Sequence, residues 1–324
     1  MPSLLQPLTL GNVRLPNNLV LSPMAGYSDL PFRILCRRHG AGLVCTEMVA
    51  APSVNRAVEP HLVRMKTVEA ERPTSIQVFG TDPDEVAQAT REVEKRCDVV
   101  GFNMGCPTFQ IQRQGCGAAL LDHPERAADL VEAMRGATRK PLLIKMRAGN
   151  RARIDVVAFA RGLERAGADG LIFHARTASQ GYSGRSDWDL IRHLKAHLAI
   201  PLIGNGDITD GPSAQRALAE SGADGVALGR AALGDPRIFH RIAHHLETGQ
   251  RLPPPTIEQR VEDFLAYLDV AEAVGLDTPH ILQQAQRFTR GLEGGAEIRS
   301  RFQGGSTPLA RIRNEFLALR AAPA

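Results

Sequence analysis

The sequence has no long apolar segment, since none of its apolar runs approaches the roughly 20 residues that a helix needs to span a bilayer. Its N-terminus has no basic segment followed by an apolar core, which predicts that there is no signal peptide. The net charge is only +4, a balance that permits an anionic partner without requiring one. These absences predict a cytoplasmic protein that does not bind membranes.

The sequence also has few features of a metal site or a disulfide framework. Its five cysteines, at positions 36, 45, 97, 106 and 116, form no Cys-x-x-Cys pair and have no metal-ligand spacing. An odd, dispersed set of this kind is typical of reduced thiols in a cytoplasmic protein. We therefore expect no metal in the protein.

What the sequence does have is a repeating pattern of a short apolar run, a glycine-bearing turn and an amphipathic helix. Continuous apolar runs are typical of buried parallel strands, and eight such units predict a closed (β/α)8 barrel. An open doubly wound sheet would need a glycine fingerprint after the first strand, which Pro23-Met-Ala-Gly26 does not provide. The eight runs are Asn18–Met24, Gly42–Val49, Thr74–Gly80, Val99–Gly105, Pro141–Arg147, Gly170–Arg176, Pro201–Asp207 and Gly225–Arg230.

Two regions depart from this repeat. Residues 50–72 have a poor helical pattern, and we expect an elaborated loop there. The proline-rich stretch Arg251-Leu-Pro-Pro-Pro-Thr256 predicts a linker, followed by apolar residues at helical spacing. The sequence therefore predicts a catalytic barrel over residues 1–250 and a small helical domain over residues 251–324.

The helical domain carries an uneven charge. Residues 284–324 hold seven arginines against three glutamates, whereas residues 252–283 are mostly acidic. Such a basic helical surface is typical of a solvated helix face, but it also suits a polyanion such as RNA. Both interpretations are open on the charge pattern alone.

One turn places a single thiol directly after a buried strand. In Val99-Val-Gly-Phe-Asn-Met-Gly-Cys106-Pro107, proline restricts the backbone of Cys106, and Gly105 allows a close approach to the chain. A cysteine here can be a structural residue or a nucleophile or acid that acts on a ligand docked above the strand. The choice depends on what the other strand ends carry.

In a (β/α)8 barrel the chemistry lies at the C-terminal ends of the strands. Glycines and an arginine follow the last two strands, and the loops after these strands often bind a phosphate. The amides Gln77 and Asn103 suit the edge of a planar heterocycle, while Lys145 and His174 can donate to its oxygens and nitrogens. Together these residues predict a flavin mononucleotide (FMN) site at the barrel mouth.

Several motifs resemble the tRNA-dihydrouridine synthase family, most closely its B-type bacterial members. They occur in the family's order over roughly residues 10–245. The motifs are Leu21-Ser-Pro-Met-Ala-Gly-Tyr-Ser-Asp-Leu-Pro-Phe-Arg33, Thr46-Glu-Met48, Asn103-Met-Gly-Cys-Pro107, Lys145-Met-Arg147, His174-Ala-Arg-Thr177, Asn205-Gly-Asp207 and Gly229-Arg-Ala231.

The resemblance implies an enzyme that reduces the 5,6 double bond of specific uridines in tRNA, with FMN as cofactor and NADPH as electron donor. It implies that Cys106 is the catalytic residue, which protonates C5 after hydride transfer from the flavin to C6. The FMN positions implied are Pro23, Met24, Ala25, Gln77, Lys145, His174, Asn205, Gly206, Asp207, Gly229 and Arg230. The target uridine and nearby tRNA are expected at Asn103, Arg176 and Tyr182.

The C-terminal domain matches the family less well. Its central helix reads Gln284-Ala-Gln-Arg-Phe-Thr-Arg290 and lacks the family's basic pair followed by an aromatic residue. We expect Arg287 and Arg290 to contact tRNA, because they lie on the arginine-rich part of this domain. One RNA-binding domain for each barrel predicts a monomer.

Two other functions are compatible with parts of this pattern. An FMN barrel that acts on a free pyrimidine, as dihydroorotate dehydrogenases do, would also use a thiol or hydroxyl on a barrel loop, but it would not need the appended helices. A non-enzymatic RNA-binding barrel would contain no flavin.

Overall fold

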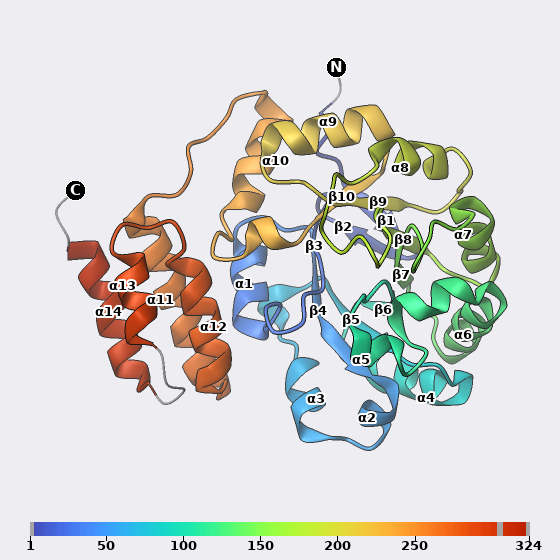
Figure 1. Cartoon of the computed structure of the whole chain (residues 1–324), viewed down its shortest axis with the longest axis horizontal. Helices are drawn as coiled ribbons and strands as arrows, with labels where there is room; N and C mark the ends of the chain where they lie inside the picture. Colours follow the sequence, from blue (N-terminus) through green and yellow to red (C-terminus); the bar gives the residue numbers. More distant parts are fainter. Residues whose placement is uncertain (1–2, 303–306, 322–324) are drawn as a thin grey trace.

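The computed structural model describes residues 3–302 and 307–321 and contains the predicted barrel. Eight parallel strands close on themselves in the order β10-β3-β4-β5-β6-β7-β8-β9 (Figure 1). Each predicted apolar run coincides with one strand, and only β4 extends one residue beyond its run, so the predicted (β/α)8 barrel is confirmed. The strands are β3 (Leu19–Leu21), β4 (Leu43–Ala50), β5 (Thr74–Phe79), β6 (Val99–Met104), β7 (Leu142–Arg147), β8 (Gly170–His174), β9 (Leu202–Asn205) and β10 (Gly225–Leu228).

An N-terminal hairpin, which the sequence pattern did not predict, precedes the barrel. Strands β1 (Leu8–Leu10) and β2 (Val13–Leu15) pair antiparallel. Their buried leucines belong to the same apolar cluster as inward-facing residues from the barrel strands, such as Ile172. A Cβ atom on Gly170 would come within 2.7 Å of Leu10 Cδ2, so the absence of a side chain there makes room for the hairpin. The hairpin therefore contributes to the interior packing of the barrel.

Amphipathic helices surround the barrel, and aspartate side chains cap the N-termini of several of them. Asp29 caps α1 by accepting a hydrogen bond from Phe32 N (2.9 Å), and Asp82 caps α4 in the same way. The outer helices are α1 (Leu30–Arg38), α4 (Pro83–Val93), α6 (Pro124–Ala137), α7 (Val156–Arg165), α8 (Trp188–Lys195), α9 (Gly211–Ser221) and α10 (Ile238–Thr248). Short segments sit in the loops: α2 (Ala51–Asn55), α3 (Glu59–Arg64), η1 (Glu69–Glu71), α5 (Phe109–Gln112), η2 (Gly117–Asp122) and η3 (Arg230–Ala232).

The expected loop over residues 50–72 contains α2, α3 and η1, so it is more ordered than its sequence pattern suggests. A buried ion pair holds it to the barrel: Arg33 Nε lies 2.6 Å from Glu71 Oε2, and both side chains are excluded from solvent. Arg33 also donates to the carbonyl oxygens of Ser28 and Lys66, both at 2.7 Å. A single buried arginine thus connects α1 to the C-terminal part of this segment.

Four helices follow the proline-rich stretch and form a bundle on one side of the barrel (Figure 1). They are α11 (Ile257–Val274), α12 (Thr278–Phe288), α13 (Gly295–Arg301) and α14 (Leu309–Ala321). The division of the chain into ranges 1–250 and 251–324 remains a prediction. Residues 1–2, 303–306 and 322–324 of these ranges lie outside the described residues.

The bundle is joined to the barrel by both apolar and polar contacts. Buried side chains of β3, α1, α10 and α11–α14 belong to one continuous apolar cluster. At its edge, Asp29 Oδ2 accepts hydrogen bonds from Tyr267 Oη (3.1 Å) and Gln284 Nε2 (3.0 Å). A carboxylate of the first barrel helix is therefore part of the interface with α11 and α12.

None of the helices in the described ranges combines the length and the apolar character that crossing a membrane requires. Within the same ranges, no three His, Cys, Asp or Glu side chains are grouped as they would be to hold a metal ion.

Candidate active site

Two cavities lie at the C-terminal mouth of the barrel and share part of their lining. The first, of about 420 Å³, lies over β7–β10, and we call it the cofactor-side cavity. The second, of about 460 Å³, contains Cys106 and reaches α12, and we call it the thiol-side cavity. Both are lined by Pro23, Met24, Lys145, Arg147, Tyr182 and Arg230.

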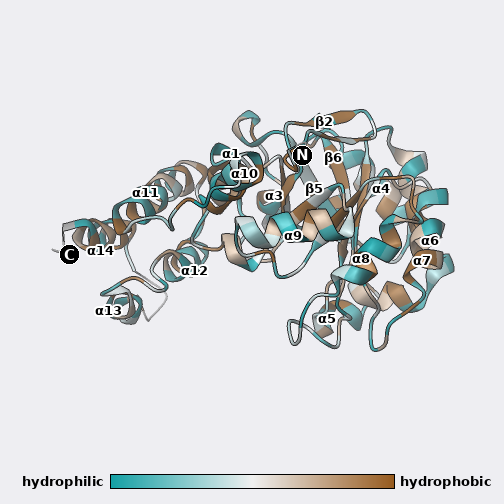
Figure 2. Cartoon of the chain, turned by 90° about the horizontal axis from the view of Figure 1, so that it is seen from above, coloured by the Kyte–Doolittle hydropathy of each residue, from teal (hydrophilic) through white to brown (hydrophobic). Residues whose placement is uncertain are grey.

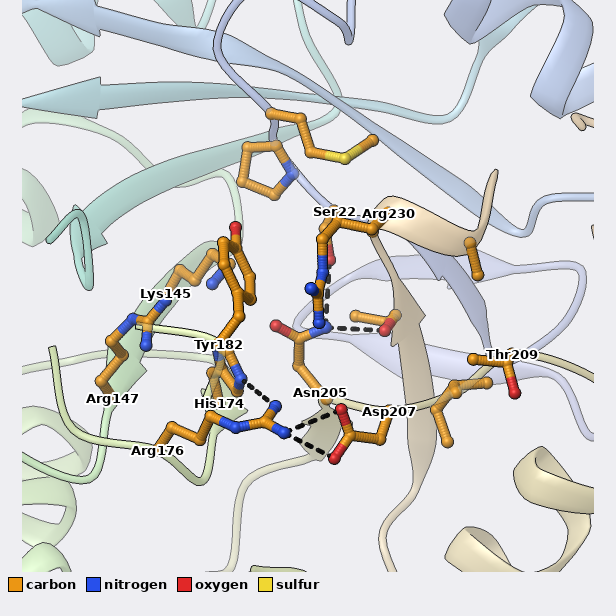
Figure 3. Close-up of a pocket in the computed structure, with 17 residues that line it drawn as sticks. Ser22, Lys145, Arg147, His174, Arg176, Tyr182, Asn205, Asp207, Thr209 and Arg230 are labelled. Carbon is orange, nitrogen blue, oxygen red and sulfur yellow. Dashed lines mark hydrogen bonds and ion pairs between the residues drawn. The ribbon is translucent and has the colours of Figure 1, made fainter. Parts of the chain in front are cut away.

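The cofactor-side cavity contains most of the residues expected to bind FMN (Figure 3). Pro23, Met24, Lys145, His174, Asn205, Gly206, Asp207, Gly229 and Arg230 line it. Ala25 and Gln77, which were expected with them, line the thiol-side cavity instead. Arg176, expected at the target uridine, lines the cofactor-side cavity. The cofactor role of Ala25 and Gln77 and the substrate role of Arg176 remain predictions.

Arg176 is held by the protein itself. Its side chain is 2% exposed, and its Nη2 donates to both carboxylate oxygens of Asp207 (2.9 and 2.7 Å). Its guanidinium also donates to two loop carbonyls, Ser183 O (3.1 Å) and Gly184 O (2.6 Å). These contacts position the loop after β8 against the loop after β9, where Asp207 adopts a positive φ of 59°. In this structure Arg176 organises the site wall.

His174 is a neutral hydrogen-bond donor at the end of β8. Desolvation, together with the nearby Lys145 and Arg147, lowers its pKa to about 2, so the imidazole is uncharged at neutral pH. Its Nε2 lies 3.3 Å from Arg176 Nη1. Because a guanidinium can only donate, Nε2 is the acceptor and Nδ1 carries the proton. The Nδ1–H group is then the donor that His174 can offer to a bound ligand.

The cofactor-side cavity has an excess of positive charge. Lys145, Arg147 and Arg230 line it, while its single acidic residue, Asp207, is paired with Arg176. Burial, and then the nearby Arg147, lowers the pKa of Lys145 to about 8. Such a charge excess is costly unless an anion compensates it. The phosphate and electron-poor ring of a flavin nucleotide fit this donor set, and the cavity volume lies in the usual range for ligand sites.

Cys106 is positioned by the amide of Asn103. Asn103 Oδ1 accepts hydrogen bonds from Gly105 N (3.1 Å) and Cys106 N (2.9 Å), while its Nδ2 donates to Gln77 Oε1 (2.8 Å). The thiol itself is half-buried and lies 3.3 Å from Thr108 Oγ1. Asn103 was expected to contact the substrate, and it lines the thiol-side cavity. Its contacts in this structure fix the turn that presents the thiol.

Tyr182 stands where the two cavities meet. Its ring is 56% exposed and has the guanidinium of Arg230 at 3.9 Å and that of Arg147 at 5.9 Å from its centroid. A ring between two cations at these distances is a cation–π arrangement. Of the predicted substrate residues, Asn103, Tyr182, Arg287 and Arg290 therefore line the same cavity as Cys106.

Sequence reasoning missed three residues of this mouth. Arg147 donates to Gly105 O (2.9 Å) in the Cys106 turn and to Gly181 O (3.0 Å) beside Tyr182. Tyr27 accepts a hydrogen bond from Arg287 Nη2 (2.6 Å), and Thr108 contacts the thiol. Arg147 and Tyr27 occur inside the quoted motifs, so their motif positions were the available signal. No pattern marked Thr108.

Comparisons with known proteins identify the family of the chain. A family model described as "Dihydrouridine synthase (Dus)" matches residues 20–320. The chain belongs to the dihydrouridine synthase family. It is similar to tRNA-dihydrouridine synthase B of Yersinia pestis (39% identity, covering 76% of this chain and 77% of that protein). It is also similar to tRNA-dihydrouridine synthase B of Pseudomonas putida (34% identity, covering 94% and 92%).

Solved structures with the same fold are more distant in sequence. An old yellow enzyme homologue from Zymomonas mobilis has a TM-score of 0.54 at 14% identity, covering 80% of this chain and 96% of that one. A 2-naphthoyl-CoA reductase complex has a TM-score of 0.59 at 12% identity, covering 75% and 52%. At these identities the likeness shows the barrel fold alone.

Proposed function

We propose that this protein is a flavin-dependent tRNA-dihydrouridine synthase, which reduces the 5,6 double bond of particular uridines in tRNA. The observation that carries the proposal is that a cationic cavity and the cavity that holds Cys106 share six lining residues. A planar cofactor in the first cavity and a uracil in the second would meet at the shared lining. The names of the similar proteins point to the same substrate.

FMN is the proposed cofactor, and NADPH is the proposed electron donor. When bound, the reduced flavin supplies a hydride for C6 of the uracil. Lys145 and Arg230 would balance the negative charge of the cofactor, and His174 Nδ1–H would donate to an acceptor on its ring. The buried contacts between Arg176 and Asp207 keep the wall of this cavity in place before the cofactor binds.

The protein's part in the reduction is a proton transfer. Addition of a hydride at C6 leaves negative charge over C5 and the neighbouring carbonyl, so C5 must receive a proton. We assign this proton to Cys106 Sγ, acting as general acid. Asn103 holds the backbone of the thiol turn, and Thr108 Oγ1 lies within hydrogen-bond distance of the sulfur. The product is 5,6-dihydrouridine, and the thiolate regains its proton from water.

The helical bundle is the proposed tRNA-binding domain. Arg287 of α12 and Arg290, which follows the end of α12, line the cavity of Cys106, so a polyanion bound along α12 would lie at the barrel mouth. A base in folded tRNA has to leave its stack to enter such a cavity. We further propose that the protein is a cytoplasmic monomer, since its five thiols are all free and each barrel has its own bundle.

The first experiment is an absorption spectrum of the purified protein, followed by NADPH and then unmodified tRNA. We expect a flavin spectrum that NADPH bleaches and that tRNA restores, with dihydrouridine formed in the tRNA. Restoration by free uridine or orotate, but not by tRNA, would instead identify an enzyme of free pyrimidines. A protein without flavin would contradict the proposed chemistry.

A further inference from the structure

An exposed aromatic ring lies next to the thiol turn on the side away from the helical bundle. Phe109, the first residue of α5, is 68% exposed, more than any other large apolar side chain in the described part of the chain. The guanidinium of Arg113, one turn later, lies 5.9 Å from the centre of its ring. Phe109 belongs to none of the apolar clusters of the described residues. Packing within the fold therefore does not explain why an aromatic side chain occupies this position.

The ring borders a basic depression of about 580 Å³. Its other wall is the loop after β7, which contributes Arg151 and Arg153. Arg113 and Arg151 form no ion pair within the described ranges, whereas Arg153 pairs with Asp187 at 2.9 Å. The single acidic residue of the lining, Asp122, accepts a hydrogen bond from Asn150 Nδ2 (2.6 Å). The depression therefore has two cations available for an anionic ligand.

The position of this depression relates it to Cys106. Phe109 follows Cys106 by three residues, and Gln112 Nε2 of α5 donates to Pro107 O (2.8 Å) in the same turn. On the opposite side of Cys106, the cavity wall is formed by Arg287 of α12 and by Arg290 just after this helix. Figure 2 shows α5 and the α12–α13 segment projecting on the same side of the molecule. A large ligand that reaches Cys106 along α12 would meet α5 beyond it.

We propose that Phe109, Arg113 and Arg151, which we call the α5 surface, form a second tRNA contact on the barrel itself. An unpaired base next to the target uridine would stack on Phe109, and its phosphates would bind Arg113 and Arg151. Removal of one base from a stack leaves its neighbour exposed, and an aromatic face accepts any base. This inference rests on the proposed function, because it takes tRNA as the partner.

The test uses the full-length, flavin-loaded protein and unmodified tRNA. Phe109→Ala should weaken tRNA binding by about tenfold, and Phe109→Trp should retain it, because a base stacks on either ring. Phe109→Leu, which keeps an apolar side chain without an aromatic face, should behave like alanine. The double variant Arg113→Ala with Arg151→Ala removes two phosphate contacts and should lower the slope of log affinity against log salt by about 1.5. Arg192→Ala, on the 63% exposed arginine of α8, is the matched control and should bind like the parent.

A fluorescence measurement reports stacking directly. The sequence has one tryptophan, Trp188, which is partly buried and donates to Gly206 O (3.1 Å). In the Phe109→Trp variant, tRNA should quench more fluorescence than it does in the parent protein. Equal quenching in the two proteins, with unchanged affinity in Phe109→Ala, would overturn the inference.

The outcomes separate this inference from the proposed function. If the parent protein binds tRNA and the Phe109 variants differ as expected, the α5 surface is supported. Absence of dihydrouridine in the same experiment would then count only against the proposed function. If the parent reduces tRNA while all α5 variants bind like the control, the function stands and the inference fails. Equal loss of affinity for tRNA and for heparin in Phe109→Ala would also overturn it, since heparin has no bases to stack.

Discussion

The two sides of the barrel mouth are built differently. On the cofactor side, Arg176, Asp207 and His174 are joined by hydrogen bonds, and Arg176 is 2% exposed. On the thiol side, Cys106 is half-buried, and Arg290, just after α12, is exposed. The first side has its geometry fixed before any ligand arrives, whereas the second presents separate groups around an open cavity.

This difference follows the kind of ligand that each side would hold. A small cofactor needs a pre-organised cavity, because each donor must face a particular atom. A folded RNA is bound mainly through its phosphates, for which exposed cations on a rigid helix are sufficient. Only Cys106 has to be placed accurately on the thiol side, and Asn103 provides that placement through two backbone hydrogen bonds. The predictions below test this contrast in order of expected effect.

The largest effect should come from the thiol itself. Cys106→Ala should lower the rate of dihydrouridine formation by about 10² to 10⁴, the usual contribution of a general acid. Flavin content should stay unchanged, because Cys106 lines only the thiol-side cavity. Cys116→Ala is the control, since Cys116 is buried and burial raises its pKa to about 11. If Cys106→Ala formed dihydrouridine at the parent rate, Cys106 would not be the general acid, and the proposed difference between the two sides of the mouth would be wrong.

A second prediction concerns the interface between the barrel and α12. Desolvation raises the pKa of Asp29 from 3.8 to about 6, although Gln284 donates a hydrogen bond to its carboxylate. The folded protein thus binds this proton more tightly than the unfolded chain does. The resulting stabilisation is complete below about pH 4 and is lost as the pH rises through 6, a change of about 3 kcal/mol.

The Asp29→Asn variant tests this effect, because it removes the titration. The difference in unfolding free energy between parent and variant should change by up to about 3 kcal/mol between pH 4 and pH 8, in favour of the variant at high pH. Denaturant unfolding at several pH values measures it. Asp210→Asn is the control, because hydrogen bonds from Ser213 outweigh desolvation and lower the pKa of Asp210, so that the corresponding difference should stay nearly constant between pH 4 and pH 8. A constant difference for Asp29→Asn would contradict the prediction.

The fold could be predicted largely from local sequence patterns. The barrel strands are largely buried on both faces, so they appear as mostly apolar runs, as Gly225–Leu228 does. The hairpin Leu8–Leu15 was missed because its strands have only three residues each and depend on packing inside the barrel. Residues 50–72 were expected as a loop because α2 and α3 are short, and their order depends on the distant Arg33–Glu71 pair.

The site was predictable in composition but less so in geometry. Motif positions brought Cys106, Lys145 and His174 to the mouth, since strand ends of a barrel converge. They could not show that the Arg176 guanidinium binds Asp207, because that contact depends on how two loops fold over each other. Likewise, the motif does not show that Asn103 holds the thiol turn. Tertiary packing decides which of these side chains face a ligand and which form hydrogen bonds within the protein.

The third prediction tests the fixed, cationic character of the cofactor side. The pKa of Lys145 is lowered to about 8 by burial and then by Arg147, and a bound anion would favour its charged form. FMN affinity should therefore be constant below about pH 8 and fall above it, by at most about tenfold per pH unit. Titration of the flavin-free protein with FMN between about pH 6.5 and about pH 9 measures this. This window extends about one pH unit or more on either side of the Lys145 pKa.

Lys145→Arg serves as the control for that titration. Arginine keeps its charge over this range, so the affinity of the variant should not fall through pH 8. Lys145→Met should bind FMN more weakly at pH 7 and also show no fall. If the parent and Lys145→Met had the same pH profile, another group would be responsible, and the cofactor side would not depend on this lysine.

The smallest expected effect belongs to the two thiol-side arginines, half-buried Arg287 and exposed Arg290. Arg287→Ala with Arg290→Ala should weaken tRNA binding by about tenfold at moderate salt, less at higher salt, and leave FMN affinity unchanged, because neither residue lines the cofactor-side cavity. The control is Arg311→Ala, an exposed arginine of α14, which Figure 1 places on the far side of the bundle from the barrel.

Arg287 also donates to Tyr27 Oη, so the single variant Arg290→Ala separates loss of charge from loss of that contact. Weaker FMN binding in either variant would mean that the two sides of the mouth are coupled, because charge on α12 would then act across the shared lining at Tyr182 and Arg230.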